Sequence, residues 1–389
     1  DELSTLVAQG DIGENDLTGE MKSYELGEND VEGIMGTAMF QERVNGEALA
    51  TLMLENTPEG GMHPAHIHMN TAAEGGDIAF TFNPVDGASG MSKTNISIMD
   101  DGEMFGYAEV LGYDGYINVH LSAEELGVIV AQGDIGQNEL TGESKTYELG
   151  EKDVAGIMGT ATFEERVNGE ALATLMLENT PDDGMHPAHI HMNTAAEGGD
   201  IAFTFNPVDG ASGMSKTNVS TLDGGEMFGY ADVLDYDGYI NVHLSAEELG
   251  VIVAQGDIGQ NELTGESVSY QLNSVDVASI MGTAMFKERV NGETLVVLSL
   301  ENTEAGGVHP AHIHMGSVAN APGDIAITLN SVIGETGMSQ TNVSAFNGDE
   351  SENISYDGLV EYDGYINVHL SADELAVLVA QGDIGANAS

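Results

Sequence analysis

Histidine is the residue type best suited to chemistry in this sequence, and its distribution is regular. The chain of 389 residues contains 12 histidines, and all of them fall in two motifs that each occur three times. One motif is His-Pro-Ala-His-Ile-His, and the other is Tyr-Asp-Gly-Tyr-Ile-Asn-Val-His. Their histidines are His63, His66, His68, His120, His186, His189, His191, His243, His309, His312, His314 and His369.

The spacing within the motifs suggests that the imidazoles converge. Residues two apart in a strand share a face, so His66 and His68 point the same way. His120 lies on the polar face of its own strand, and His63 stands at a strand entry, where it can fold over that face. If the two strands are neighbours, four imidazoles meet in each unit, a donor set that suits Cu(II) or Zn(II). We therefore expect one copper or zinc site per repeat.

A purely structural role for the histidines is the main alternative. Histidines in a β-domain can donate to backbone carbonyls and hold a loop without any metal. Met62 and Met69 flank the first cluster, and a thioether is a soft ligand for Cu(I). However, Met69 alternates to the face of Ile67, so we expect it in the core.

The elements around these motifs are predominantly strands. Residues 48–55 form an apolar run, and residues 77–83 and 116–121 alternate, with Ile78, Phe80 and Phe82 assigned to one face. Residues 122–133 read as a short helix, because Ser122 and Glu125 form a capping box and Gly133 can end it. Turn signals separate many short strands. The fold class predicted is all-β: three tandem β-sandwich domains of Greek-key type, each with one short helix near its C-terminal end.

The repeat defines a frame for the whole chain. Its units are residues 21–143, 144–266 and 267–389, and the third carries three extra residues between its two motifs. Units of this size can each hold a core of their own. Residues 1–20 are an additional copy of the unit-terminal segment 124–143. That copy suggests head-to-tail continuity, through either a longer array or an inter-subunit connector, because heterologous contacts that do not close produce fibres.

Charge excludes several classes of partner. Nine Lys and Arg residues against 65 Asp and Glu residues give a formal net charge of −56. Nucleic acids and anionic lipid surfaces need basic patches, so neither is expected as a partner. No apolar run has the length of a membrane helix, so membrane insertion is not expected. The carboxylates suit a solvated acidic surface, while turns such as 11–16 and 134–139 could offer oxygen ligands to calcium.

No catalytic constellation is visible, and we expect no enzyme. The sequence has no cysteine, no G-x-S-x-G, no P-loop and no H-E-x-x-H. The absence of cysteine also excludes a disulfide-stapled fold. The chain starts at Asp1 rather than at Met, which indicates a processed or partial product, here interpreted as a secreted one.

The order of motifs resembles a known family. Gly36-Thr37-Ala38, the His66-Ile67-His68 strand, the Asn118-Val119-His120 strand and the following 132–135 segment are similar to the CHRD domain, named after chordin and widespread in bacterial secreted proteins. The resemblance covers each unit almost entirely. It implies a secreted β-domain rather than a particular activity.

A weaker resemblance is to copper/zinc superoxide dismutases. It implies that His66, His68 and His120 are copper ligands. A separate zinc loop, a disulfide and an active-site arginine are not found, and a charge of −56 would repel superoxide.

Together these features predict a secreted, extracellular repeat protein. We expect the structural subunit of a fibre or biofilm matrix, assembled head to tail, with one histidine metal site per repeat. The alternatives are an extracellular copper- or zinc-buffering protein that does not polymerise and a redox enzyme of the superoxide dismutase kind.

Overall fold

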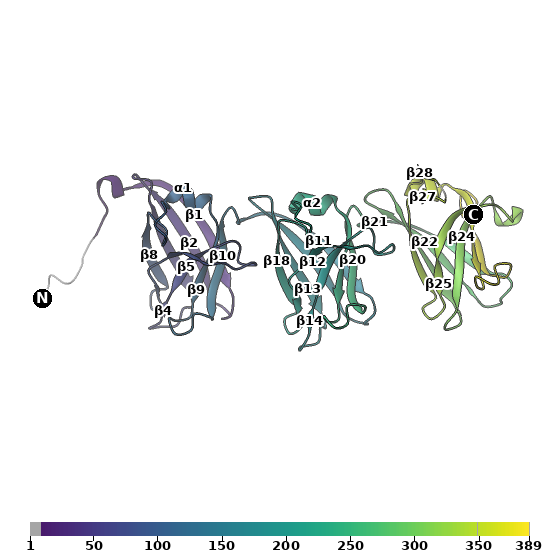
Figure 1. Cartoon of the computed structure of the whole chain (residues 1–389), viewed down its shortest axis with the longest axis horizontal. Coiled ribbons are helices and arrows are strands. Elements are labelled where there is room, and N and C mark those ends of the chain that lie inside the picture. Colours follow the sequence, from purple (N-terminus) through teal and green to yellow (C-terminus); the bar gives the residue numbers. More distant parts are fainter. Residues whose placement is uncertain (1–8, 348, 389) are drawn as a thin grey trace.

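The computed structural model describes residues 9–347 and 349–388, and it contains three β-domains arranged in a row (Figure 1). The prediction of an all-β chain with three domains is confirmed. Within the described residues, no helix combines the length and the apolar character that a bilayer crossing needs.

The elements recur in the same order from domain to domain. The first domain comprises β1 (Leu17–Glu28), β2 (Met35–Arg43), β3 (Ala48–Glu55), β4 (Met62–His63), β5 (Ala65–Met69), β6 (Ile78–Thr81), β7 (Val85–Asp86), β8 (Met91–Ile96), α1 (Tyr107–Leu111), β9 (Asp114–His120) and β10 (Ile129–Gly136). The second comprises β11 (Leu140–Glu151), β12 (Met158–Arg166), β13 (Ala171–Glu178), β14 (Met185–His186), β15 (Ala188–Met192), β16 (Ile201–Thr204), β17 (Val208–Asp209), β18 (Met214–Val219), α2 (Tyr230–Asp235), β19 (Asp237–His243) and β20 (Ile252–Gly259). The third comprises β21 (Leu263–Ser274), β22 (Met281–Arg289), β23 (Thr294–Glu301), β24 (Val308–Met315), η3 (Val318–Asn320), β25 (Ile325–Ile333), β26 (Met338–Val343), β27 (Ala345–Phe346), β28 (Asp349–Asn353), α3 (Tyr356–Val360), β29 (Asp363–His369) and β30 (Leu378–Gly385).

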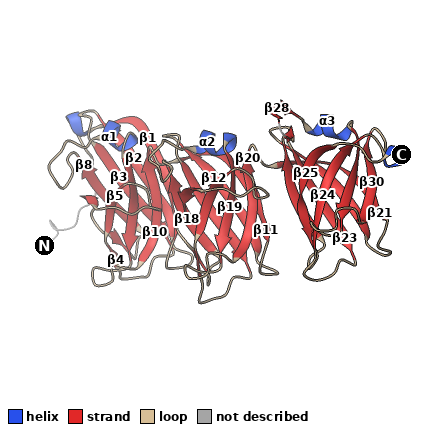
Figure 2. Cartoon of the chain, turned by 45° about the vertical axis from the view of Figure 1, so that its right-hand side comes forward, coloured by secondary structure: helices blue, strands red, loops and turns tan. Residues whose placement is uncertain are grey.

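Each sheet curls into an antiparallel barrel rather than forming two separate layers (Figure 2). In the third domain the closed order is β21-β22-β23-β26-β25-β24-β29-β30. In the first domain β4 and β5 together correspond to β24, and β6 and β7 together correspond to β25. Strands β5 and β6 pair, as do β4 and β7, and β7 pairs with β8, so the first domain forms the same eight-position barrel. Successive strands β24, β25 and β26 are neighbours, and β23 lies beside β26, which is the Greek-key arrangement that was predicted.

The apolar sides of the strands fill each barrel. In the first domain the core includes Phe40, Leu52, Ile67 and Ile117, all almost fully buried. Predicted strand 48–55 coincides with β3, while 77–83 and 116–121 contain β6 and most of β9. Ile78 does not share the inward face of Phe80, because a bulge opposite His68 shifts the register and leaves Ile78 47% exposed.

The helix predicted over residues 122–133 is wrong. Ser122 to Glu125 forms a turn, closed by the Glu125 N–H donating to the Ser122 carbonyl, and β10 begins at Ile129. Strand β10 pairs with both β9 and β1 and so completes the barrel. This non-local pairing overrides the helical pattern. The short helix of the domain is α1, before β9, where the Gly106 N–H donates to the Glu109 carboxylate at 2.9 Å.

Domain boundaries follow the strands. The frame boundary 143/144 lies inside β11, and 266/267 lies inside β21. Of the extra copy 1–20, residues 1–8 lie outside the described residues, Gly13–Asn15 forms the 3-10 turn η2, and residues 17–20 belong to β1.

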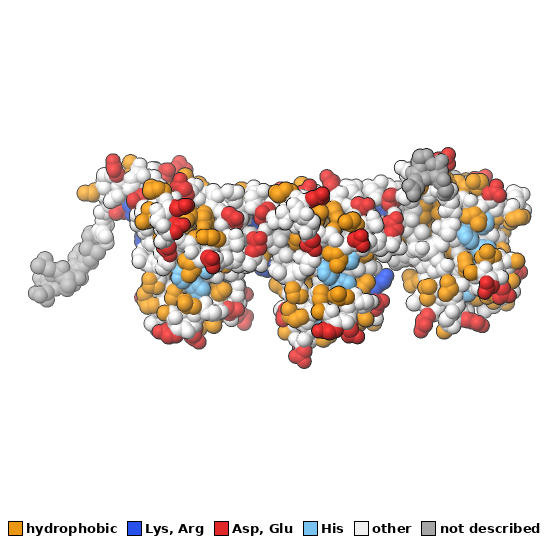
Figure 3. Space-filling model, viewed as in Figure 1, with side chains coloured by type: hydrophobic (Ala, Val, Ile, Leu, Met, Phe, Trp, Pro, Cys, Tyr) orange, Lys and Arg blue, Asp and Glu red, His pale blue; other side chains and the backbone are white. Residues whose placement is uncertain are grey.

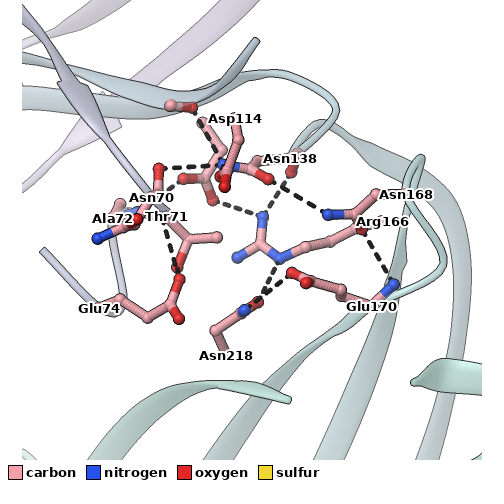
Figure 4. Close-up of polar contacts among 12 residues, drawn as sticks. Asn70, Thr71, Ala72, Glu74, Asp114, Asn138, Arg166, Asn168, Glu170 and Asn218 are labelled. Carbon is pink, nitrogen blue, oxygen red and sulfur yellow. Dashed lines mark hydrogen bonds and ion pairs between the residues drawn. The ribbon is translucent and has the colours of Figure 1, made fainter. Parts of the chain in front are cut away.

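A buried arginine joins the first two domains (Figure 4). The Arg166 side chain is 0% exposed and lies between β10 and β18. Its guanidinium donates to the Asp134 carboxylate and the Asn218 side-chain oxygen, at 2.8 and 2.9 Å, and to the Asn138 carbonyl. The second oxygen of Asp134 accepts the Ala72 N–H at 2.8 Å. The arginine therefore clamps the end of one barrel to the next.

The same clamp recurs along the chain. Arg289 pairs with Asp257 at 2.8 Å and with the Asn261 carbonyl, so the third domain is attached as the second is. In the first domain, Arg43 is held by Asp11 and by the carbonyl of Asn15, the counterparts of Asp134 and Asn138. These three arginines are all the arginines of the sequence.

Candidate metal centre

Three histidines of the first domain meet on the outer surface of the barrel. Strands β5 and β9 are neighbours, with His66 opposite Asn118 and His68 opposite Tyr116. Ile67 between them points into the core, so His66 and His68 face outward and His120 joins them from β9. One ring nitrogen from each of the three lies within 4.8 Å of the other two. We call this group the histidine trio.

Backbone carbonyls orient two of the rings. His68 Nδ1–H donates to the Gly76 carbonyl at 2.9 Å, and His120 Nδ1–H donates to the Leu126 carbonyl at 2.6 Å. These bonds select the tautomer that leaves the Nε2 lone pair free, as the hydrogen-bond partners of metal-binding histidines do. His66 contributes the opposite nitrogen, because its Nδ1 is buried without a partner among the described residues. The available donors are thus two Nε2 atoms and one Nδ1 atom.

An aromatic ring supports the trio from the side. The Tyr116 ring stacks on His68, with centroids 5.0 Å apart and an interplanar angle of 18°. The Tyr116 hydroxyl accepts the N–H of Gly76, whose carbonyl holds His68, at 3.2 Å. Tyr116 therefore fixes both the ring and the loop that orients it.

The trio is reproduced in the other domains, and the histidines lie on the surface of all three (Figure 3). The centroids of the two rings on one strand are 5.9 Å apart in every domain, and the first of these rings lies 5.1 Å from the ring on the neighbouring strand. In the third domain His312 Nδ1 lies 3.1 Å from His369 Nε2. The corresponding groups are His189, His191 and His243, and His312, His314 and His369.

Burial lowers the pKa of two histidines in each trio, which favours their neutral form. Desolvation, followed by the neighbouring His120 and His68, lowers the pKa of His66 to about 4. The pKa of His189 falls to about 4 for the same reasons, and the pKa of His312 is lowered as well. A neutral imidazole has the lone pair that a metal requires. Three nitrogens bound to one ion at 2.0–2.1 Å lie about 3.5 Å apart in trigonal geometry, so small side-chain movements bring the trio into range.

The fourth histidine of each unit does not join the trio, so the expectation of four converging imidazoles is wrong. His63 Nδ1–H donates to the Leu121 carbonyl at 2.9 Å, and its Nε2 packs against Gly61, where an added Cβ would lie only 2.8 Å away. His186 and His309 likewise bond the carbonyls of His243 and His369. These three buried side chains tie the strand entry to the end of the neighbouring strand, which is the structural role considered above as the alternative.

Two neighbours of the trio escaped the sequence reasoning. Asp100 is bonded to Thr81, the residue opposite His66, and its charge raises the pKa of His66 against the larger lowering effects. No local pattern marks Asp100. Tyr116 could have been found, since it shares the polar face of Asn118 and His120. Met69 is 42% exposed rather than part of the core.

Carboxylates of the acidic turns considered for calcium are engaged in ion pairs with lysine and arginine. Asp134 is bonded to Arg166 and to the Ala72 N–H, and Glu139 pairs with Lys22 at 2.6 Å. Asp11 pairs with Arg43 at 3.0 Å. Within residues 9–347 and 349–388, every group of three or more His, Cys, Asp or Glu side chains that could hold a metal ion is a histidine trio.

Comparison with known proteins adds no family to this description. No family model matches the chain, and neither a curated protein nor a solved structure matches it.

Proposed function

We propose that the protein is a metal-binding array in which each of the three domains binds one copper or zinc ion on its histidine trio. The observation that carries this proposal is the presence of three imidazoles with nitrogens within 4.8 Å of one another in every domain. His68 and His120 each donate their Nδ1–H to a backbone carbonyl, so the Nε2 lone pair of each ring is free to bind a metal. An all-imidazole donor set suits both copper and zinc.

Metal stoichiometry of the full chain tests this proposal. We expect three equivalents of Cu(II) or Zn(II) by titration and elemental analysis, and two after His120→Ala. The variant that also carries His243→Ala and His369→Ala should bind none. His63→Gln is the matched control, because His63 is a buried histidine outside the trio, and it should retain three. Three equivalents in the triple variant, or fewer in the folded control than in the wild type, would contradict the assignment.

We further propose that this array is an extracellular structural element, assembled head to tail in a fibre or matrix. The recurring arginine clamp favours this role, because Arg166 and Arg289 join the domains through the same set of acceptors. Asp383 and Asn387 of the third domain make the equivalent internal bonds, to the Val318 N–H and the Gly316 carbonyl, and within residues 9–347 and 349–388 no arginine is bonded to them. The resemblance to CHRD domains supports secretion.

Sedimentation velocity tests assembly. It should be run at 0.5 M salt, because self-repulsion at a charge of −56 is then screened. We expect concentration-dependent species larger than one chain, and their reduction in Asp383→Asn. A monomer at all concentrations would contradict head-to-tail assembly and favour the alternative of a metal-buffering protein that does not polymerise. A superoxide dismutation assay of the copper-loaded chain checks the enzymatic alternative, for which we expect no activity above that of free copper.

A further inference from the structure

A second set of metal ligands lies on the outer face of the first domain, in a row across four strands. Met62 of β4 is opposite Asp86 of β7, Asp86 is opposite Met91 of β8, and Met91 is opposite Met53 of β3. Directly opposite residues in neighbouring strands point to the same face. The three methionines are 52%, 41% and 38% exposed. We call this group the methionine row.

The spacing of the row allows its ligands to meet. Neighbouring strands are about 4.8 Å apart, so Met62 and Met91 each lie one strand spacing from Asp86 and can reach an ion above its carboxylate. Met53 lies two spacings from Asp86 and borders the site without reaching that ion. Methionine side chains are unbranched and flexible, which lets their sulfurs approach over the carboxylate. Both bonds from Ser89 to the Asp86 carboxylate use the same oxygen, Oδ1, at 2.9 Å. The other oxygen remains available as a ligand.

The second domain has the same row and the third does not. In the second domain Met185, Asp209, Met214 and Met176 occupy the matching positions. In the third domain these positions are Val308, Ile333, Met338 and Ser299. Three of the four row residues are therefore missing from an otherwise equivalent surface.

This difference shows that the fold does not require methionine in the row. Valine is a better strand former than methionine, and the third barrel has Val308 in place of Met62 and Ser299 in place of Met53. Thioether sulfur is a soft neutral donor that selects Cu(I) over harder ions. We propose that the methionine rows of the first and second domains each bind one soft monovalent metal ion of the Cu(I) class, with Asp86 and Asp209 offsetting its charge. This site is separate from the histidine trio and does not depend on it.

The test is a titration of the full chain with Ag(I), a redox-inert probe of the Cu(I) class, followed by NMR of 13C-methyl-labelled methionines. We expect the methyl signals of the two rows to shift together and to saturate near two equivalents. Met338 is the built-in control, because it is 43% exposed at the same strand position but lacks the other thioethers. Its signal should stay in place until the rows are full. Because imidazole also binds Ag(I), the titration uses the full chain carrying His120→Ala, His243→Ala and His369→Ala, so failure of one site is distinguishable from failure of the other.

Substitution localises the effect. In the variant Met53→Leu/Met91→Leu, the shift of Met62 should be lost while the row of the second domain responds as before. Leucine keeps the exposed apolar surface, so folding is preserved. Simultaneous shifts of Met338, Met104 and the row methionines, or an unchanged Met62 response in the variant, would overturn the proposal, since they indicate unspecific thioether binding. If no methionine signal shifts, the proposal is overturned as well, and the methionine row is an exposed apolar surface without a metal-binding role.

Discussion

The third domain differs from the first two around the metal centre but not within it. The ring spacings of the trio are the same in all three domains. Yet Asn347 occupies the position at which Asp100 and Asp223 bond the threonine opposite the first histidine of each trio. The methionine row is also absent from the third domain. The comparison shows that strand register determines the trio, while exposed residues around it vary without disturbing its geometry.

The largest expected effect concerns the two arginine-mediated junctions, which attach the second and third domains. Arg166→Ala and Arg289→Ala should each weaken their junction by about 3 kcal/mol, because each removes a fully buried guanidinium and leaves a partly buried aspartate and a carbonyl without it. Equal losses, measured by calorimetric unfolding of the full chain, would show that the third domain differs only on its outer face.

The control for the arginine variants is Lys145→Ala. The pair between Lys145 and Glu262 is partly exposed, so less than about 1 kcal/mol should be lost. A loss in Arg289→Ala well below that in Arg166→Ala would show instead that the third domain is attached differently.

Acid should destabilise all three metal-free domains in the same direction. The pKa of His66 is about 4 in the folded state and near 6.5 in the unfolded state, so the unfolded chain takes up a proton first as the pH falls. The stabilisation is complete above pH 6.5 and is lost progressively towards pH 4. After allowance for solvent screening, urea unfolding at pH 7 and at pH 4 should differ by roughly 2 kcal/mol in the first and second domains, and in the same direction in the third.

His312 lies in the third trio, and its pKa is also lowered by burial. Replacing His66, His189 and His312 with asparagine should therefore reduce the pH dependence of the free energy of unfolding in every domain. An acid-insensitive third domain in the wild type would break the equivalence of the three trios.

The tyrosine beside each trio should matter more in the third domain. The Tyr365 hydroxyl accepts the Gly323 N–H at 2.8 Å, compared with 3.2 Å between Tyr116 and Gly76. Replacement by phenylalanine retains the ring stacking and removes this bond, at a cost of about 1 kcal/mol. We expect Tyr365→Phe to lower thermal stability and the amide protection of Gly323 more than Tyr116→Phe does for Gly76. The reverse order would show that the loops differ by more than this bond.

The carboxylate difference should have the smallest effect. Asp223→Asn makes the second trio resemble the third, and we expect its Zn(II) affinity to fall two- to five-fold, since an exposed charge contributes less than about 1 kcal/mol. Asn347→Asp should raise the affinity of the third trio correspondingly. Chelator competition measures both changes, and the difference should shrink at 0.5 M salt. An effect that is independent of salt would mean that Asp223 acts through the fold and not through its charge.

Much of the candidate site could be predicted from local pattern. Alternation places His66 and His68 on one face, and the polar face of the second motif contains His120. The same reasoning failed for His63, because the path of the chain after a proline is not periodic and the Leu121 carbonyl captures that ring. It also failed for Met69, which the end of β5 leaves exposed. Asp100 is remote in sequence and joins only through pairing of distant strands.

The sequence by itself determined the repeat, the all-β class, the strand β3 and the facing of the paired histidines, since each depends on periodicity over a few residues. Only the tertiary structure decided that residues 129–136 form a strand and not a helix, because β10 is stabilised by ladders to β1 and β9 that no local window contains. The arginine clamp was likewise invisible in sequence. Arg166, Asp134 and Asn218 come together only when one barrel is stacked on the next, where burial makes their pairing necessary.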